Sequence, residues 1–148
     1  MIAIASDHAG IALKGEIITL LEQLERPYLD VGTTSTESTD YPVWGYRAAR
    51  LVVSGECERA IIVCGTGVGI SLAANKVKGI RCVVCSDCYT AKLSRLHNNT
   101  NMLSLGARVL GIDLAKMIVQ IWLDTPFEGG RHQKRLDMIS SIEAGNEL

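Results

Sequence analysis

Short apolar runs alternate along the chain with longer segments of helical periodicity, and this alternation limits the possible folds more than any other feature. Runs such as Ala60–Cys64 (AIIVC) and Cys82–Cys85 (CVVC) contain no charged side chain. Strands of that kind are covered on both faces, which is typical of a parallel sheet between two layers of helices. The sequence therefore predicts an α/β fold, a doubly wound, Rossmann-like sandwich with roughly five parallel strands and C-terminal helices.

The expected elements follow this alternation. Strands are expected at Ile2–Ser6, Arg26–Val31, Arg59–Cys64, Ile80–Ser86 and Met102–Leu105. Helices are expected near Ile11–Leu24, Val43–Ser54, Gly69–Lys76, Tyr89–Leu96, Gly111–Leu123 and Arg131–Glu143. A length of 148 residues fits one domain with a full core, so we expect a single domain over residues 1–148.

Charge and hydropathy exclude several classes of function. A net charge of −1 gives no electrostatic basis for general nucleic-acid binding. No apolar run approaches the ~20 residues that cross a membrane. The N-terminal MIAIASDHAG has neither a basic leader nor a cleavage-type segment, so we expect a cytoplasmic location.

Five cysteines are an odd number, which favours free thiols over a disulfide framework. The segment CVVCSDC has the spacing of a metal cluster. However, Cys82 and Cys85 are three residues apart on an expected strand, so their side chains point to opposite faces. A fourth ligand at the usual iron–sulfur spacing is also missing, and we expect no metal here.

Residues capable of chemistry follow the expected strands. Ligands bind at the carboxyl ends of the strands in a doubly wound sheet. The sequence places one set of residues on that rim: Asp7, His8, Cys64, Thr66, His97, Asn98 and Arg108.

The segment CGTGVGIS, which follows the third strand, predicts a site for an anion. Gly65, Gly67 and Gly69 allow backbone N–H groups to surround a phosphate or an enediolate beside a helix N-terminus. Cys64 stands next to them, and a helix N-terminus favours a thiolate. Such a thiolate, oriented by Thr66, suits the removal of a proton next to a carbonyl.

A dinucleotide fingerprint is the alternative interpretation of this loop. Asp87 follows Gly67 by 20 residues, as the ribose-binding acid of that motif does. Against it, the third glycine comes one residue early, and the loop follows the third strand instead of the first. We therefore favour the anion hole over NAD binding.

The other polar residues each have a structural and a functional interpretation. Asp7 is a good helix N-cap as well as a candidate ligand-binding group, and His8 could bind phosphate. His97 fits a helix C-terminus, which favours histidine. Arg131 and Arg135 share a helix face, where their repulsion disappears if a phosphate sits between them.

Several motifs together resemble the ribose-5-phosphate isomerase B family. They are SDHAG, DYP, CGTGVGIS followed by AANK, GIR, HNNTN, GARV and EGGRHQKR, in order along nearly the whole chain. The resemblance implies interconversion of ribose 5-phosphate and ribulose 5-phosphate without metal or cofactor. It also implies a homodimer with the active site shared between subunits, and it leaves a tetramer open.

The resemblance also implies individual roles. Cys64 is the base that moves the proton between C1 and C2, with Thr66 beside it. His97 opens the furanose ring. The residues implied in substrate binding are Asp7, His8, Tyr41, Gly65, Gly67, Val68, Gly69, Asn98, Arg108, Arg131 and Arg135.

Substrate size stays open at this stage. Relatives of the family act on hexose 6-phosphates, such as allose or galactose 6-phosphate. The non-enzymatic alternative is a regulatory module that binds a nucleotide or a sugar phosphate. This alternative assigns no role to Cys64.

Overall fold

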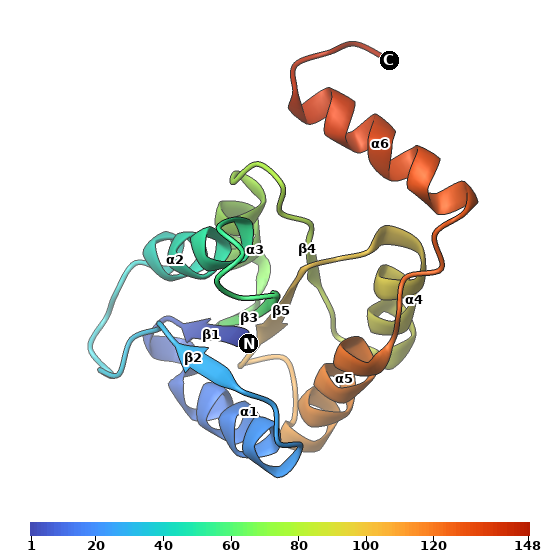
Figure 1. The fold of residues 1–148 in the computed structure, drawn as a ribbon. Helices are drawn as coiled ribbons and strands as arrows, with labels where there is room; N and C mark the ends of the chain where they lie inside the picture. The colour runs from blue at the N-terminus through green and yellow to red at the C-terminus, as the bar shows by residue number, and fades with distance from the viewer.

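Five parallel strands form the central sheet, in the order β2-β1-β3-β5-β4 (Figure 1). The computed structural model describes all 148 residues. Every residue of the interior strand β1 is buried, as its apolar sequence requires. The predicted α/β, doubly wound fold is confirmed. The strands are β1 (Ile2–Ser6), β2 (Tyr28–Asp30), β3 (Arg59–Cys64), β4 (Cys82–Val84) and β5 (Met102–Gly106).

Helices cover both faces of this sheet (Figure 1). One face packs against α1 (Ile11–Gln23), α4 (Cys88–Asn98) and α5 (Ile112–Asp124) through a cluster of 18 buried residues that includes Trp122. The other face packs against α2 (Tyr41–Val53) and α3 (Val68–Asn75) through a cluster of 12 buried residues. None of the helices combines the length and the apolar content that a membrane span needs.

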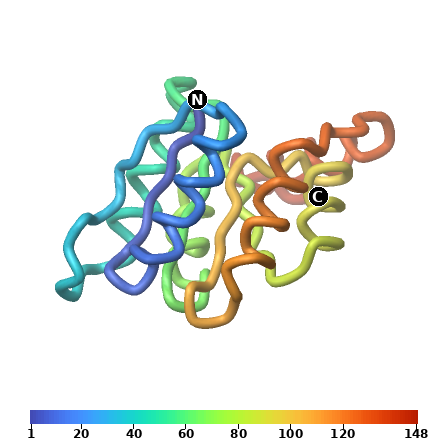
Figure 2. The backbone as a smooth tube through the Cα atoms, turned by 90° about the horizontal axis from the view of Figure 1, so that it is seen from below, coloured from blue at the N-terminus to red at the C-terminus, as the bar shows by residue number.

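The C-terminal helix α6 (Arg131–Glu143) stands apart from these layers. In both views it lies at the margin of the molecule, on the side of α4 (Figures 1 and 2). It buries only His132 and Leu136. Met138, Ile139 and Ile142 remain 42%, 49% and 56% exposed. The helix therefore presents an apolar surface that this chain does not cover.

The two edge strands are shorter than the sequence predicts. β2 and β4 contain 3 residues each, where we expected Arg26–Val31 and Ile80–Ser86. An edge strand has a hydrogen-bonding partner on one side only. At the start of β4, the Arg81 amide donates to the Asn101 side chain at 2.8 Å instead of pairing with a strand. A local polar contact therefore replaces strand pairing of this amide just before β4 begins.

The strand order reverses between β1 and β3. The chain leaves β1 towards β2 on one side and leaves β3 towards β4 and β5 on the other. The carboxyl ends of such a pair form the crevice where doubly wound sheets bind ligands. Asp7 and His8 follow β1, and Cys64 ends β3. The topology therefore brings these residues to one crevice, although they are distant in sequence.

A buried lysine ties the segment after β2 to the core. Lys14 Nζ lies 2.9 Å from an Asp30 carboxylate oxygen and donates to the Thr33 carbonyl at 2.8 Å, with 4% of its side chain exposed. Lys14→Met should lower the free energy of unfolding by about 1–3 kcal/mol, because Asp30 and the carbonyl lose their donor. Urea denaturation measures the change.

Lys116→Met is the matched control for that measurement. Lys116 Nζ lies 3.0 Å from a Glu16 carboxylate oxygen, but both side chains are partly exposed. Exposed ion pairs contribute about 0–1 kcal/mol. An equal loss of stability in the two variants would contradict a special role for Lys14.

Candidate active site

A pocket of about 210 Å³ opens at the carboxyl ends of β1 and β3. Its lining contains most of the residues that the sequence placed on this rim, together with Tyr41 from the start of α2. A larger groove of about 540 Å³ between α4 and α5 contains none of them. The small pocket is lined by Asp7, His8, Ala9, Tyr41, Cys64, Gly65, Thr66, Gly69 and Arg108.

Cys64 is held rigidly at the base of this pocket. It is 4% exposed, and the Gly67 amide donates to its Sγ at 3.2 Å. Its carbonyl accepts from the Ala107 amide at 2.8 Å, which ties the end of β3 to the segment after β5. The amide donor interacts more strongly with a thiolate than with a thiol. The site therefore fixes the sulfur in the pocket.

The loop after Cys64 depends on glycine. Gly67 has a φ of +81°, and a Cβ there would lie 2.9 Å from the Leu105 carbonyl carbon. A Cβ on Gly69 would lie 2.6 Å from Tyr41 Cζ, so this glycine makes room for the aromatic ring. The amides of Gly65, Thr66 and Gly69 have no acceptor within the chain. These donors stand beside Cys64 at the N-terminus of α3, where an anion is stabilised.

Asp7 caps the short 3-10 helix His8–Gly10, because its Oδ1 accepts the Ala9 amide at 3.0 Å. The expected capping role is confirmed, and the same side chain also lines the pocket. His8 Nδ1 accepts the Thr39 amide at 3.1 Å. The proton of the neutral ring therefore resides on Nε2, which leaves His8 a single ring donor for a ligand.

Arg108 is exposed, and its guanidinium covers Gly65, where a Cβ would lie 3.2 Å from Nη1. Arg131 and Arg135 are exposed on α6. None of the three arginines forms an ion pair within the chain. Each guanidinium is therefore free to bind a phosphate, the ligand that the sequence predicted for Arg131 and Arg135.

The placement of His97 and Asn98 on the carboxyl rim was wrong. Both belong to α4, which begins after the carboxyl end of β4 and runs back towards the amino end of β5. Arg81, directly before β4, donates to the Asn98 carbonyl at 3.0 Å. An α-helix of this length spans about 16 Å. The two residues therefore lie at the amino edge of the sheet, across it from Cys64.

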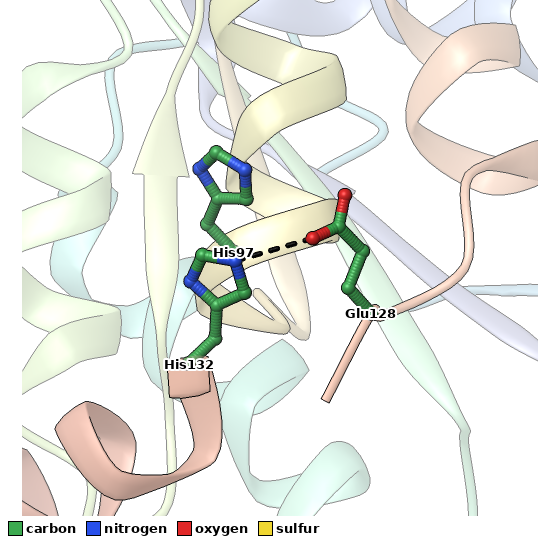
Figure 3. Close-up of side chains that lie close together, drawn as sticks. All are labelled: His97, Glu128 and His132. Carbon is green, nitrogen blue, oxygen red and sulfur yellow. Dashed lines mark hydrogen bonds and ion pairs between the residues drawn. The ribbon is translucent and has the colours of Figure 1, made fainter. Parts of the chain in front are cut away.

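At that edge His97 meets two residues that the sequence did not single out (Figure 3). Its ring stacks on that of His132, with the centroids 4.2 Å apart and the planes 15° from parallel. His132 Nε2 lies 3.2 Å from Glu128 Oε2. The segment EGGRH contains both residues, with Glu128 four residues before His132, but nothing in this spacing indicates contact with His97.

The remaining cysteines differ from Cys64 in their surroundings. Burial raises the pKa of Cys57 and Cys82, and raises the pKa of Cys85 to about 12. Cys82 packs against one core cluster and Cys85 belongs to the other, so the prediction of opposite faces is confirmed. These protonated thiols are structural, and Cys64 alone among the five lines the pocket.

Comparison with known proteins agrees with this geometry. Residues 2–139 match the model of the family described as Ribose/Galactose Isomerase. The chain belongs to the ribose/galactose isomerase family. It is 53% identical over 142 residues to ribose-5-phosphate isomerase B of Escherichia coli, covering 96% of this chain and 95% of the relative.

Two further relatives widen the comparison within the ribose/galactose isomerase family. The structure of ribose-5-phosphate isomerase B from Clostridium thermocellum has 51% sequence identity and a TM-score of 0.96, covering 97% of each chain. D-erythrulose-4-phosphate isomerase of Pectobacterium atrosepticum is 41% identical over 143 residues, covering 96% of this chain and 94% of the relative. The resemblance to ribose-5-phosphate isomerase B is confirmed.

Proposed function

We propose that this chain interconverts D-ribose 5-phosphate and D-ribulose 5-phosphate. The observation that carries the proposal is the environment of the buried Cys64 sulfur, which accepts a hydrogen bond from the Gly67 amide. The amides of Gly65, Thr66 and Gly69 lie in the same loop and have no acceptor within the chain. Family membership and relatives of 53% and 51% identity that are named as ribose-5-phosphate isomerases support the same reaction.

In the proposed chemical step, the Cys64 thiolate removes the proton from C2 of the open-chain aldose. The electron pair forms the C1–C2 double bond, and the carbonyl oxygen at C1 becomes an oxyanion. The amides of Gly65 and Gly69 stabilise this cis-enediolate as its charge develops. The thiol then returns the proton to C1, while the hydroxyl proton on O2 passes to the oxyanion on C1, which leaves a hydroxyl at C1 and a ketone at C2. No step calls for a metal or a redox cofactor.

We further propose that the working enzyme is a homodimer whose sites are shared between subunits. Cys64 ends β3 at the carboxyl edge, whereas His97 lies at the amino edge, and strands of five or six residues separate these edges by roughly 16–20 Å. A second chain can supply His97, Arg131 and Arg135 to the pocket. The exposed apolar surface of α6 supports this arrangement, since a dimer would bury it.

Arg135→Ala should raise the KM for ribose 5-phosphate strongly, at least about tenfold, because a charge-assisted contact with the phosphate is lost. Initial-rate kinetics measure this change. Lys134→Ala is the matched control, since Lys134 is an exposed cation on the same helix. A similar KM change in both variants would indicate general electrostatic attraction instead of a specific contact.

Mixed dimers test the sharing of the site. A Cys64→Ala chain refolded with an Arg135→Ala chain should regain activity, because one of the two sites then combines the intact residues of both. Each variant refolded alone is the reference. If mixing restores nothing, the sites lie within single chains or Arg135 has another task.

The experiment that tests the reaction itself is turnover of ribose 5-phosphate in D2O. Proton transfer through a thiol predicts solvent deuterium at C1 or C2 of the recovered sugar phosphates, read by NMR. A chelator should not abolish the activity. Binding of the sugar phosphate without turnover would instead support a regulatory module.

A tetrose phosphate is the second candidate substrate, favoured by the relative named D-erythrulose-4-phosphate isomerase at 41% identity. A hexose 6-phosphate is the third, because the family description includes galactose. Comparing kcat/KM for ribose 5-phosphate, a tetrulose 4-phosphate and allose 6-phosphate separates these candidate substrates.

Three further expectations from the sequence stay predictions. They are the single domain over residues 1–148, the cytoplasmic location and a tetramer.

A further inference from the structure

A cluster of three side chains from separate segments meets at the amino edge of the sheet (Figure 3). His97 lies in the last turn of α4, Glu128 lies between α5 and α6, and His132 lies in the first turn of α6. The Glu128 amide donates to the Leu96 carbonyl at 3.0 Å, which fixes this connection against α4. His132 is only 7% exposed. The cluster is therefore held in place by backbone contacts.

The ligand atoms of these three residues all lie within 4.8 Å of one another. Bonds from Zn²⁺ to imidazole nitrogen and carboxylate oxygen are about 2.0–2.2 Å, so the ligand atoms around one tetrahedral ion lie about 3.3–3.5 Å apart. The largest separation must therefore shorten by at most about 1.5 Å, which rotation of the side chains can supply. The His97 side chain contacts His132 by stacking. No hydrogen bond holds its ring within the chain, so the ring can turn towards an ion.

We propose that His97, Glu128 and His132 bind one Zn²⁺ ion per chain. Two imidazoles and one carboxylate, with a fourth position left to water, form the donor set of an open zinc site. Nitrogen donors favour Zn²⁺ over Mg²⁺ and Ca²⁺, which prefer oxygen. The contact between Glu128 and His132 already brings two of the three ligands together.

Occupancy of this site has a consequence for turnover. The metal takes the lone pair of His97 that ring opening would use, so Zn²⁺ should inhibit the isomerisation of ribose 5-phosphate. This consequence rests on the proposed function, whereas metal binding does not. The ion is therefore an inhibitor here and takes no part in the reaction.

Binding is tested on the metal-free protein by titration with Zn²⁺ against a chromophoric chelator, and with Co²⁺ followed by visible absorption. We expect one ion per chain and a tetrahedral Co²⁺ spectrum. Glu128→Gln and His132→Asn should each weaken binding by more than about tenfold, because one of three protein ligands is lost. Circular dichroism verifies that each variant folds. Because the Glu128 side chain is exposed, Glu128→Gln should fold normally and tests the site even if the buried His132→Asn substitution unfolds the protein.

His8→Asn is the matched control, because the chain contains 3 histidines and His8 is the one outside the cluster. It should leave the affinity for Zn²⁺ unchanged. Equal affinity in all the variants would overturn the proposal. A sulfur-to-cobalt charge-transfer band would also overturn it, because it would place the ion on a cysteine.

Kinetics distinguish the metal site from the proposed reaction. Each protein is compared with its own metal-free rate, at a Zn²⁺ concentration that fills the wild-type site. Turnover of ribose 5-phosphate by the wild-type protein should fall severalfold. Turnover by Glu128→Gln should fall less. Equal inhibition of both proteins would overturn inhibition through this cluster. Stoichiometric binding without inhibition would support the metal site and contradict the ring-opening role of His97.

Discussion

Cys64→Ala should abolish isomerisation of ribose 5-phosphate, with a loss in kcat of about 10³- to 10⁴-fold, because the thiolate that removes the proton from C2 is lost. The protein should still fold, since alanine fits the end of a buried strand. It should also still bind the sugar phosphate, which calorimetry can measure directly because the variant does not consume it. Cys64→Ser should not rescue activity, since a hydroxyl is too weak a base near pH 7.

Cys88→Ala is the control for that variant. Cys88 is a half-buried thiol at the start of α4 and does not line the pocket, so its loss should change kcat little. Cys57 is less suitable, because it is 1% exposed and its removal leaves a small cavity. Substantial activity in Cys64→Ala would remove the proposed base and direct attention to His8 or Asp7.

His97→Asn should slow turnover of ribose 5-phosphate by about 10²-fold or more, as expected for loss of a general acid–base group. Ribose 5-phosphate in water is almost entirely furanose, so the ring must open before Cys64 can act. Opening delivers a proton to the ring oxygen and removes another from the anomeric hydroxyl. Imidazole can do either near neutral pH.

A tetrose 4-phosphate separates ring opening from proton transfer. Its phosphate occupies the oxygen that would close a five-membered ring, so it stays open. Its isomerisation should be nearly insensitive to His97→Asn and should still be lost in Cys64→Ala. Equal losses on both substrates would mean that His97 takes part in the proton transfer or holds the site together. Equal retention would assign ring opening to another residue.

The core of the candidate site could be predicted from the sequence because its geometry is local. Cys64, the glycine loop and the start of α3 follow one another within a few residues, and the structure joins them by the contact from the Gly67 amide to the Cys64 sulfur. The rule that ligands bind at the carboxyl ends of parallel strands then brought Asp7 to the same pocket. That rule needs only the alternation of strands and helices.

Long-range geometry was harder to predict. The bounds of β1 and β3 were correct because both strands are buried on each face. The edge strands β2 and β4 are shorter than predicted, and before β4 the Arg81 amide bonds to the Asn101 side chain instead of a strand. The pairing of Glu128 with His132 depends on the turn between them. Nothing in the periodicity of the chain indicates that this turn docks on the end of α4.

The sequence by itself determined the fold class, the position of the pocket and the cysteine at its base, because apolar runs and glycine spacing act over a few residues. Only the tertiary structure decided on which edge of the sheet His97 lies. The three turns of α4 carry that side chain across the whole depth of the sheet. A polar segment after a strand looks the same in sequence whether it remains a loop at the rim or winds into a helix that returns its end to the opposite edge.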